Sequence, residues 1–281
     1  MSNVNAPASS VRTSLAAYGG STFSYMWSGT ALDAMHQMQA LGLNVFDIIM
    51  VPGHCWHDEL SPVQRSELSA KLRSEGLAID SLNLPALDQN LASCVPEARA
   101  YAVSLYTDVL QLSSDLGGRA VVAVPGRVSA LFPPPRLSSE GWLEDSLTQL
   151  LRVAERLDQT LYIESHPQTP IPTVATIEAF MARLPHERLK VAYDVSNAEF
   201  VAEDQVDALR RLAPRLGQLH LSDGTRSRWR HDRIGLGTVD FPAIMRTLDE
   251  IDFAGTRVLE IVSPTPREDI ERSIEALGLM R

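Results

Sequence analysis

The feature that most constrains the fold of this sequence is an alternation of short apolar runs with longer amphipathic stretches. The runs are rich in valine, isoleucine and leucine, as are strands that are buried on both faces of a parallel sheet. We expect strands at residues 21–26, 44–51, 77–84, 119–125, 160–165, 189–195, 216–222 and 256–262. The stretches between them, such as ALDAMHQMQALG and WLEDSLTQLLRVAERLD, have the spacing of helices that are apolar on one side.

Eight strands alternating with helices predict an α/β fold, a (β/α)8 TIM barrel, rather than an open doubly wound sheet. No G-x-G-x-x-G motif follows the first strand, so the sequence does not support a dinucleotide-binding fold. No glycine/serine run, charge block or low-complexity tract divides the 281 residues, and we expect a single domain. Residues 1–15 are expected to form a flexible arm, and residues 16–281 the barrel.

The charge of the chain argues against nucleic acid as a partner, because the formal net charge is −10 and nucleic-acid affinity depends on neutralising phosphates. No segment approaches the roughly 18 to 20 apolar residues of a membrane span, and the first residues lack the pattern of a secretory signal. We therefore expect a cytoplasmic protein that acts on a small molecule without a membrane partner, as a homo-oligomer. Lys71 and Lys190 are the only lysines, and Cys55 and Cys94 form no C-x-x-C pair. Schiff-base chemistry and a cysteine-rich zinc site thus have almost no candidates.

Polar side chains stand at or near the ends of the last four predicted strands: Glu164, Asp194, His220 and Glu260. Taken singly, each has a structural explanation, as a helix cap or a hydrogen-bonded core residue. Because the carboxyl ends of the strands of a barrel meet on one face, the four side chains are expected to converge. Three unpaired carboxylates would repel one another, and a bound divalent cation resolves this conflict. Mostly oxygen ligands with one imidazole favour Mn²⁺, Mg²⁺ or Co²⁺ over a structural zinc and do not decide among the three. Of these, Mn²⁺ is our expectation.

From the first predicted strand to the eighth, the chain resembles the xylose isomerase-like TIM-barrel superfamily of sugar isomerases and epimerases, which includes an endonuclease IV type, and the most specific matches lie in the second half. The motifs that carry the resemblance are YIESH, AYDVSN, LHLSDGTR, RHDRIGLGTVDF and VLEIV. The resemblance to the ketose 3-epimerase and hydroxypyruvate isomerase branches implies one metal ion held by Glu164, Asp194, His220 and Glu260. It also implies that Glu164 and Glu260 act as acid and base on opposite faces of the substrate, and that Arg226 contacts substrate oxygens.

The resemblance implies a metal-dependent isomerase or epimerase of a sugar, keto-acid or cyclitol that works through an enediolate. A lyase or dehydratase, including one that cleaves a carbon–glycoside bond, could use the same ligands and is the alternative. A phosphodiesterase of the endonuclease type ranks behind both, because Trp229 and Val124 stand where that branch has an aspartate and a histidine. A binding protein that only kept the fold is disfavoured by the intact ligand set.

Four further residues are candidates for substrate binding. His166 follows the fifth predicted strand and could help in acid–base transfer or play a structural role. Asn197 stands where epimerases often have a histidine. His54 and Trp56, after the second predicted strand, suit stacking and hydrogen bonding to a ring, or else fill the gap in their own loop.

The remaining expectations concern support around the site. We expect Asp223 to lie just outside the metal ligands and to fix the tautomer of His220, and His231 to lie in the same surrounding layer. Arg228 and Arg230 are expected to be solvated loop charges. Residues 126–142, rich in proline, could form a lid, an oligomer contact or an ordinary surface loop.

Overall fold

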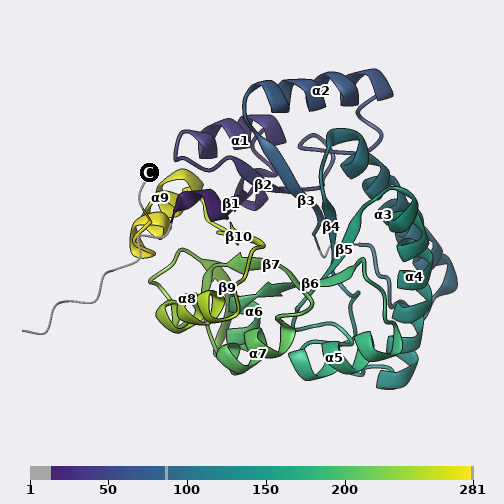
Figure 1. Ribbon diagram of the computed structural model, residues 1–281. Helices are drawn as coiled ribbons and strands as arrows, with labels where there is room; N and C mark the ends of the chain where they lie inside the picture. Colours follow the sequence, from purple (N-terminus) through teal and green to yellow (C-terminus); the bar gives the residue numbers. More distant parts are fainter. Residues whose placement is uncertain (1–13, 86–87, 280–281) are drawn as a thin grey trace, which may run out of the picture.

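The computed structural model of the protein describes residues 14–85 and 88–279 and confirms the predicted barrel. Eight parallel strands close on themselves in the order β1-β10-β7-β6-β5-β4-β3-β2 (Figure 1). Their bounds are β1 Tyr18–Ser21, β2 Val45–Ile49, β3 Ala78–Leu84, β4 Ala120–Ala123, β5 Thr160–Glu164, β6 Leu189–Asp194, β7 Leu216–Leu221 and β10 Thr256–Leu259. An antiparallel hairpin of β8 (Asp223–Thr225) and β9 (Arg228–Asp232) lies outside the barrel.

Helices surround the barrel, as Figure 1 shows. They are α1 Ala31–Gln39, α2 Pro62–Ser74, α3 Pro96–Leu116, α4 Arg136–Arg156, α5 Val174–Arg183, α6 Val195–Phe200, α7 Gln205–Leu212, α8 Phe241–Glu250 and α9 Pro266–Ala276. Capping boxes begin α1, α2 and α5, and proline stands in the first turn of α2, α3, α8 and α9, where its missing N–H is not needed. No helix in the described part of the chain is both long and apolar enough to cross a bilayer.

The main core lies between the outer face of the barrel and the helices, and a smaller one fills the barrel interior. The interior core combines Ala120, Val122 and Ala192 with the ring of Tyr162. A Cβ at Gly217 would lie 2.4 Å from the Tyr162 ring, so glycine on β7 makes room for that ring. The barrel is therefore a packed support whose strand ends are held in place.

The first predicted strand is wrong in position. Residues 21–26 were expected to be extended, but β1 covers Tyr18–Ser21, and Phe23–Tyr25 form a 3₁₀ helix, η2. The reason is steric, because a Cβ at Gly19 would lie 2.8 Å from the Val45 carbonyl oxygen. Glycine is therefore needed in this strand, and a glycine-containing segment lacks the apolar pattern by which strands are predicted.

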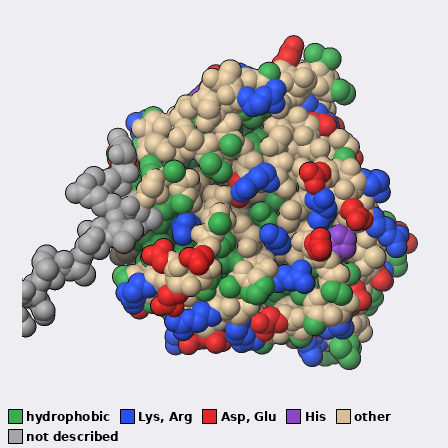
Figure 2. Space-filling model, in the orientation of Figure 1, with side chains coloured by type: hydrophobic (Ala, Val, Ile, Leu, Met, Phe, Trp, Pro, Cys, Tyr) green, Lys and Arg blue, Asp and Glu red, His purple; other side chains and the backbone are tan. Residues whose placement is uncertain are grey.

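Two other boundaries also differ from expectation. Most of the predicted N-terminal arm lies outside the described residues, but its last residue, Leu15, begins the 3₁₀ helix η1 (Leu15–Ala17) and is buried in the core. The proline-rich loop expected over residues 126–142 ends sooner, because α4 begins at Arg136. Figure 2 shows basic and acidic side chains interspersed over the face in view.

Candidate metal and active site

The structure brings together the four residues that the strand ends predicted. Glu164 ends β5, Asp194 ends β6, His220 is the last but one residue of β7, and Glu260 follows β10 directly. Each offers one ligand atom, and these atoms all lie within 4.8 Å of one another. All four residues are buried. We call them the four-residue cluster.

The unpaired atoms of the four-residue cluster fit a cation. The His220 Nδ1 atom lies 3.3 Å from Glu260 Oε2, 3.7 Å from Glu164 Oε1 and 4.0 Å from Asp194 Oδ2. Asp194 Oδ2, His220 Nδ1 and Glu260 Oε2 are buried without a hydrogen-bond partner. Buried polar atoms without partners are costly, and three carboxylate oxygens with one imidazole nitrogen are ligands that suit a divalent ion.

The two glutamates of the cluster differ in acidity. Burial, reinforced by Glu260 and opposed by His220, raises the pKa of Glu164 to about 7. Burial also acts to raise the pKa of Glu260, but the imidazoles of His220 and His231 outweigh it and hold this pKa well below its usual range. Two carboxyl groups whose environments separate their pKa values are suited to opposite roles in proton transfer.

Gln218 supports His220 from inside the barrel. The His220 Nε2 atom lies 2.8 Å from Gln218 Oε1, and the Gln218 amide nitrogen donates to Asp80 Oδ2 (2.7 Å) and Ser81 Oγ (2.8 Å). This network leaves His220 Nδ1 facing the carboxylates. Gln218 was not expected from the sequence, although a strand places residues two apart on the same side, and this spacing could have indicated it.

Asp223 does not contact His220 through a hydrogen bond, contrary to expectation. Its carboxylate instead accepts hydrogen bonds from the backbone N–H groups of Gly224, Gly235 and Val239. The reason is geometric: Nε2 of His220 is already engaged by Gln218, and Nδ1 faces the cluster. Asp223 therefore organises the loop after β9 rather than the metal ligand.

His231, on β9, lies directly against the cluster. Its Nδ1 atom is 3.3 Å from Glu260 Oε2 and 3.5 Å from Asp194 Oδ2, and 3.2 Å from Ser222 Oγ. Burial acts to lower the pKa of His231, but the carboxylates of Asp194 and Glu260 raise it to about 9. The hairpin thus adds a positive group beside the carboxylates.

A further buried acid, which was not expected from the sequence, lies on β2. Asp47 is fully buried and accepts hydrogen bonds from Ser21, Ser81 and Asn83. Burial, partly offset by His220, raises its pKa to about 6. An aspartate inside the apolar run NVFDIIMV was the signal available for it.

A cavity of about 390 Å³ opens beside the cluster, and His166, Asn197 and Trp229 line it together with Glu164 and Glu260. The Trp229 indole nitrogen donates to Asn197 Oδ1 at 2.6 Å, and the ring meets His166 edge to face, with centroids 4.9 Å apart. Burial, with His231 and Arg127 nearby, lowers the pKa of His166 to about 4. Trp229, noted in the sequence only for replacing an aspartate, is a wall of this cavity.

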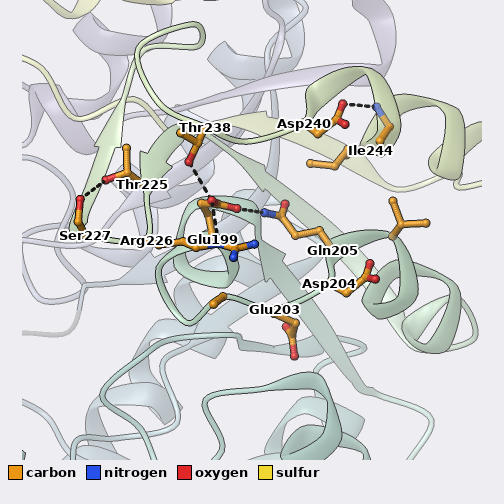
Figure 3. A pocket seen from close by; sticks show the side chains of 13 residues that line it. Glu199, Glu203, Asp204, Gln205, Thr225, Arg226, Ser227, Thr238, Asp240 and Ile244 are labelled. Carbon is orange, nitrogen blue, oxygen red and sulfur yellow. Dashed lines mark hydrogen bonds and ion pairs between the residues drawn. The ribbon is translucent and has the colours of Figure 1, made fainter.

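Arg226 lies elsewhere. Its side chain is 68% exposed, and its Nε atom is 3.5 Å from Glu199 Oε1. It lines a different pocket, of about 830 Å³, whose wall includes Gln205 and Thr238, both bonded to the Glu199 carboxylate (Figure 3). The spacing that implied a substrate contact therefore places Arg226 in the wall of a pocket other than the cavity beside the cluster.

His54 and Trp56 are also not part of the cavity wall. His54 is buried, with its ring nitrogens bonded to the Gly29 carbonyl and the Thr22 hydroxyl. Trp56 packs against the main core and beside His57. Both side chains stabilise the loop after β2, which was the alternative interpretation of this motif. Arg228 and Arg230 are largely exposed, though Arg230 reaches the rim of the cavity and pairs with Asp232.

The chain is similar to proteins of known activity. Residues 35–280 match the family model of the xylose isomerase-like TIM barrel. The D-psicose 3-epimerase of Ruminiclostridium cellulolyticum is 23% identical over 83% of this chain and 79% of that protein. Two solved structures have the same fold: a D-tagatose 3-epimerase-like protein (TM-score 0.79, 18% identity) and the 3-keto-D-glucoside 4-epimerase of E. coli (TM-score 0.78, 20% identity). Each alignment covers 93% of this chain and 98% of the other protein. By the match of residues 35–280 and the closed barrel they form, this chain belongs to the xylose isomerase-like TIM barrel family.

Proposed function

We propose that this protein is a divalent-metal-dependent epimerase of a keto sugar. The observation that carries the proposal is the four-residue cluster: three of its ligand atoms are buried without a hydrogen-bond partner, and Glu164 and Glu260 line a cavity of about 390 Å³. The names of the relatives support the reaction class, since they are 3-epimerases of ketoses and a 4-epimerase of a keto-glucoside. Mn²⁺ is the ion we favour. A cytoplasmic location and a homo-oligomeric state remain predictions of the sequence.

Glu164, Asp194, His220 and Glu260 would hold the ion. A bound divalent cation supplies a Lewis acid that polarises a carbonyl and makes the neighbouring C–H bond more acidic. Glu164 ends β5 and Glu260 directly follows β10, and these two strands are separated in the barrel by β6 and β7. Their carboxylates therefore approach a bound substrate from different sides.

The acidities assign the two proton transfers. Glu260, whose pKa is held low, is ionised and suited to remove the proton from the carbon beside the carbonyl. Glu164, whose pKa of about 7 in the metal-free protein makes it the weaker acid of the pair, would return a proton to the opposite face of the same carbon. One proton is taken and one is returned, and the configuration of that carbon is inverted. His166, neutral near pH 7, could donate a hydrogen bond to a substrate oxygen.

The test is incubation of the Mn²⁺-loaded protein in D₂O with a panel of ketoses and keto-glycosides. Epimerisation predicts one deuterium at the inverted carbon. Glu260→Gln should abolish turnover, because the base is lost, while Glu199→Gln, a buried glutamate bordering the other pocket, should retain it. Exhaustive chelation should also stop the reaction, and Mn²⁺ should restore it.

Three results would contradict the proposal. Loss of water from the substrate, seen by mass, would identify a dehydratase. Deuterium on the neighbouring carbon would identify an aldose–ketose isomerase. Turnover that survives chelation would exclude the metal mechanism.

A further inference from the structure

The cavity beside the four-residue cluster has a large apolar wall. Besides the polar residues already described, it is lined by Phe23, Met26, Pro85, Val124 and Val262. We propose that the substrate carries an apolar substituent, of the size of a phenyl ring, on the sugar that reaches the cluster. This inference rests on the proposed function and specifies its substrate class as glycosides of a keto sugar rather than free ketoses.

One part of the apolar wall is built from both ends of the chain. The Ser24 hydroxyl donates to the Ile261 carbonyl at 2.6 Å and accepts from the Ser263 N–H at 2.8 Å. These bonds fasten the segment of Phe23 and Met26 to the segment of Val262. Val262 is two residues from Glu260, and 38% of it is exposed, so bare apolar surface lies next to a ligand of the cluster.

The other part of the wall follows two neighbouring strands. Pro85 and Val124 come directly after β3 and β4, whose last residues, Leu84 and Ala123, are paired. Both side chains are buried, and neither offers a hydrogen-bonding side-chain group. A ligand that reaches these two side chains meets apolar surface.

Several polar groups of the cavity are already engaged. The Asn197 amide accepts from Trp229 Nε1 and donates to the Ser165 carbonyl at 3.0 Å. The Asn83 amide nitrogen donates to Asp47 at 3.0 Å, and Arg230 Nε donates to Asp232 at 2.8 Å. Hydroxyl groups placed against the apolar wall would find few hydrogen-bond partners, which is unfavourable, whereas an apolar substituent placed there would be buried favourably.

Turnover provides the first measurement. The Mn²⁺-loaded full-length protein would be given 3-keto-glucosides whose anomeric oxygen carries hydrogen, methyl or phenyl. We expect kcat/KM for the phenyl compound to exceed that for the methyl compound by about tenfold or more, the scale on which apolar pockets discriminate. Equal values for the three compounds would overturn the inference.

Binding provides a second measurement that needs no turnover. Phenyl and methyl β-D-glucoside, which lack the keto group, would be titrated into the protein by calorimetry, and tighter binding of the phenyl compound is expected. If no keto sugar is turned over, the proposed function fails, and this comparison still decides whether the apolar wall binds an aryl group. Equal affinities would overturn the inference independently.

Matched variants test whether the preference for the phenyl group comes from the apolar wall. Val262→Thr and Met26→Gln replace apolar surface with polar groups of similar size and should reduce the ratio of phenyl to methyl binding several-fold. Val63→Thr makes the same exchange at an exposed valine of α2 outside the cavity and should leave the ratio as it is. If Val262→Thr instead dissociates an oligomer and leaves the ratio unchanged, the wall is an interface between copies, and the inference is wrong.

Discussion

The orientation of the His220 ring determines which of its nitrogen atoms faces the carboxylates of the four-residue cluster. Because the Gln218 amide nitrogen donates to Asp80 and Ser81, its oxygen faces His220 Nε2. A hydrogen on Nε2 then leaves the Nδ1 lone pair directed at the carboxylates, where a cation is needed. Such outer partners commonly tune metal affinity.

Gln218→Leu removes the acceptor for His220 Nε2 and should weaken Mn²⁺ binding by about 10- to 100-fold. Titration of the metal-free protein with Mn²⁺ measures this change. Gln149→Leu, the same exchange on the exposed side of α4, should bind the ion as the wild type does. Equal affinities in the two variants would show that the amide does not position the ring.

Metal affinity should depend on pH through Glu164. Its pKa of about 7 in the metal-free protein means that the ion must displace a proton below that pH. Affinity should therefore fall as pH decreases from 7, by up to about tenfold per pH unit for each displaced proton. The pKa of His220, raised by Glu260 and Glu164 against the effect of burial, acts in the same direction.

Competition titrations with Mn²⁺ over the range of about pH 5.5 to 8.5, which brackets this pKa, would measure the slope. Glu164→Gln has no titrating group at this position and should show a shallower dependence, besides weaker binding. An affinity independent of pH in the wild type would contradict the raised pKa.

At the scale of elements, the β8–β9 hairpin and the loop before α8 form one unit that carries His231 and Trp229. The Asp223 carboxylate holds this unit together through backbone N–H groups. Gly237 is required there, because a Cβ would lie 2.2 Å from both Asp223 Oδ1 and the Gly224 carbonyl oxygen. Of the two glycines in the motif RHDRIGLGTVDF, Gly237 is thus required by packing, whereas a Cβ at Gly235 would meet no atom within 4 Å.

Gly237→Ala should lower the free energy of unfolding by about 1–3 kcal/mol, as overpacking does, and should weaken Mn²⁺ binding because His231 moves. Urea denaturation and metal titration would measure the two effects. Gly141→Ala is the matched control: no atom lies within 4 Å of its Cβ, and its place inside α4 predicts a gain of about 0.5–1 kcal/mol. A Gly237→Ala variant as stable as the wild type would contradict the packing requirement at this glycine.

At the scale of the whole molecule, one half of the barrel supplies every residue of the cluster. β5, β6, β7 and β10 are consecutive in the closed sheet, so a bound ion links four neighbouring strands. Without the ion, three carboxylates and two imidazoles share one buried space. Metal binding should therefore stabilise the barrel itself.

Mn²⁺ should raise the Tm of the wild type in a concentration-dependent way, corresponding to about 2.7 kcal/mol when its concentration is one hundred times Kd. Glu260→Gln should lose most of this gain, and Glu199→Gln should keep it. Scanning calorimetry with and without chelator provides the measurement. A Tm that does not respond to Mn²⁺ would mean that the cluster does not bind this ion in the folded protein.

By itself, the sequence determined the order of strands and helices and the four residues of the cluster. Both can be read from local patterns. The periodicity of apolar residues indicates the strands and helices, and polar residues at strand ends indicate the cluster, so neither requires knowledge of contacts between distant segments. It misplaced β1, because Gly19 and Gly20 are required by neighbours on β2 and α1 rather than by the strand itself.

Only the tertiary structure decided where the loop side chains lie. Arg226 pairs with Glu199, and Asp223 accepts hydrogen bonds from backbone groups of its own loop. Trp229 and Val262 line the cavity. These positions depend on contacts between segments far apart in the chain, such as Ser24 with residues 261–263. A loop has no periodicity that would indicate such contacts, so the loop residues that line the cavity could not be predicted from sequence patterns, while the four residues of the cluster could.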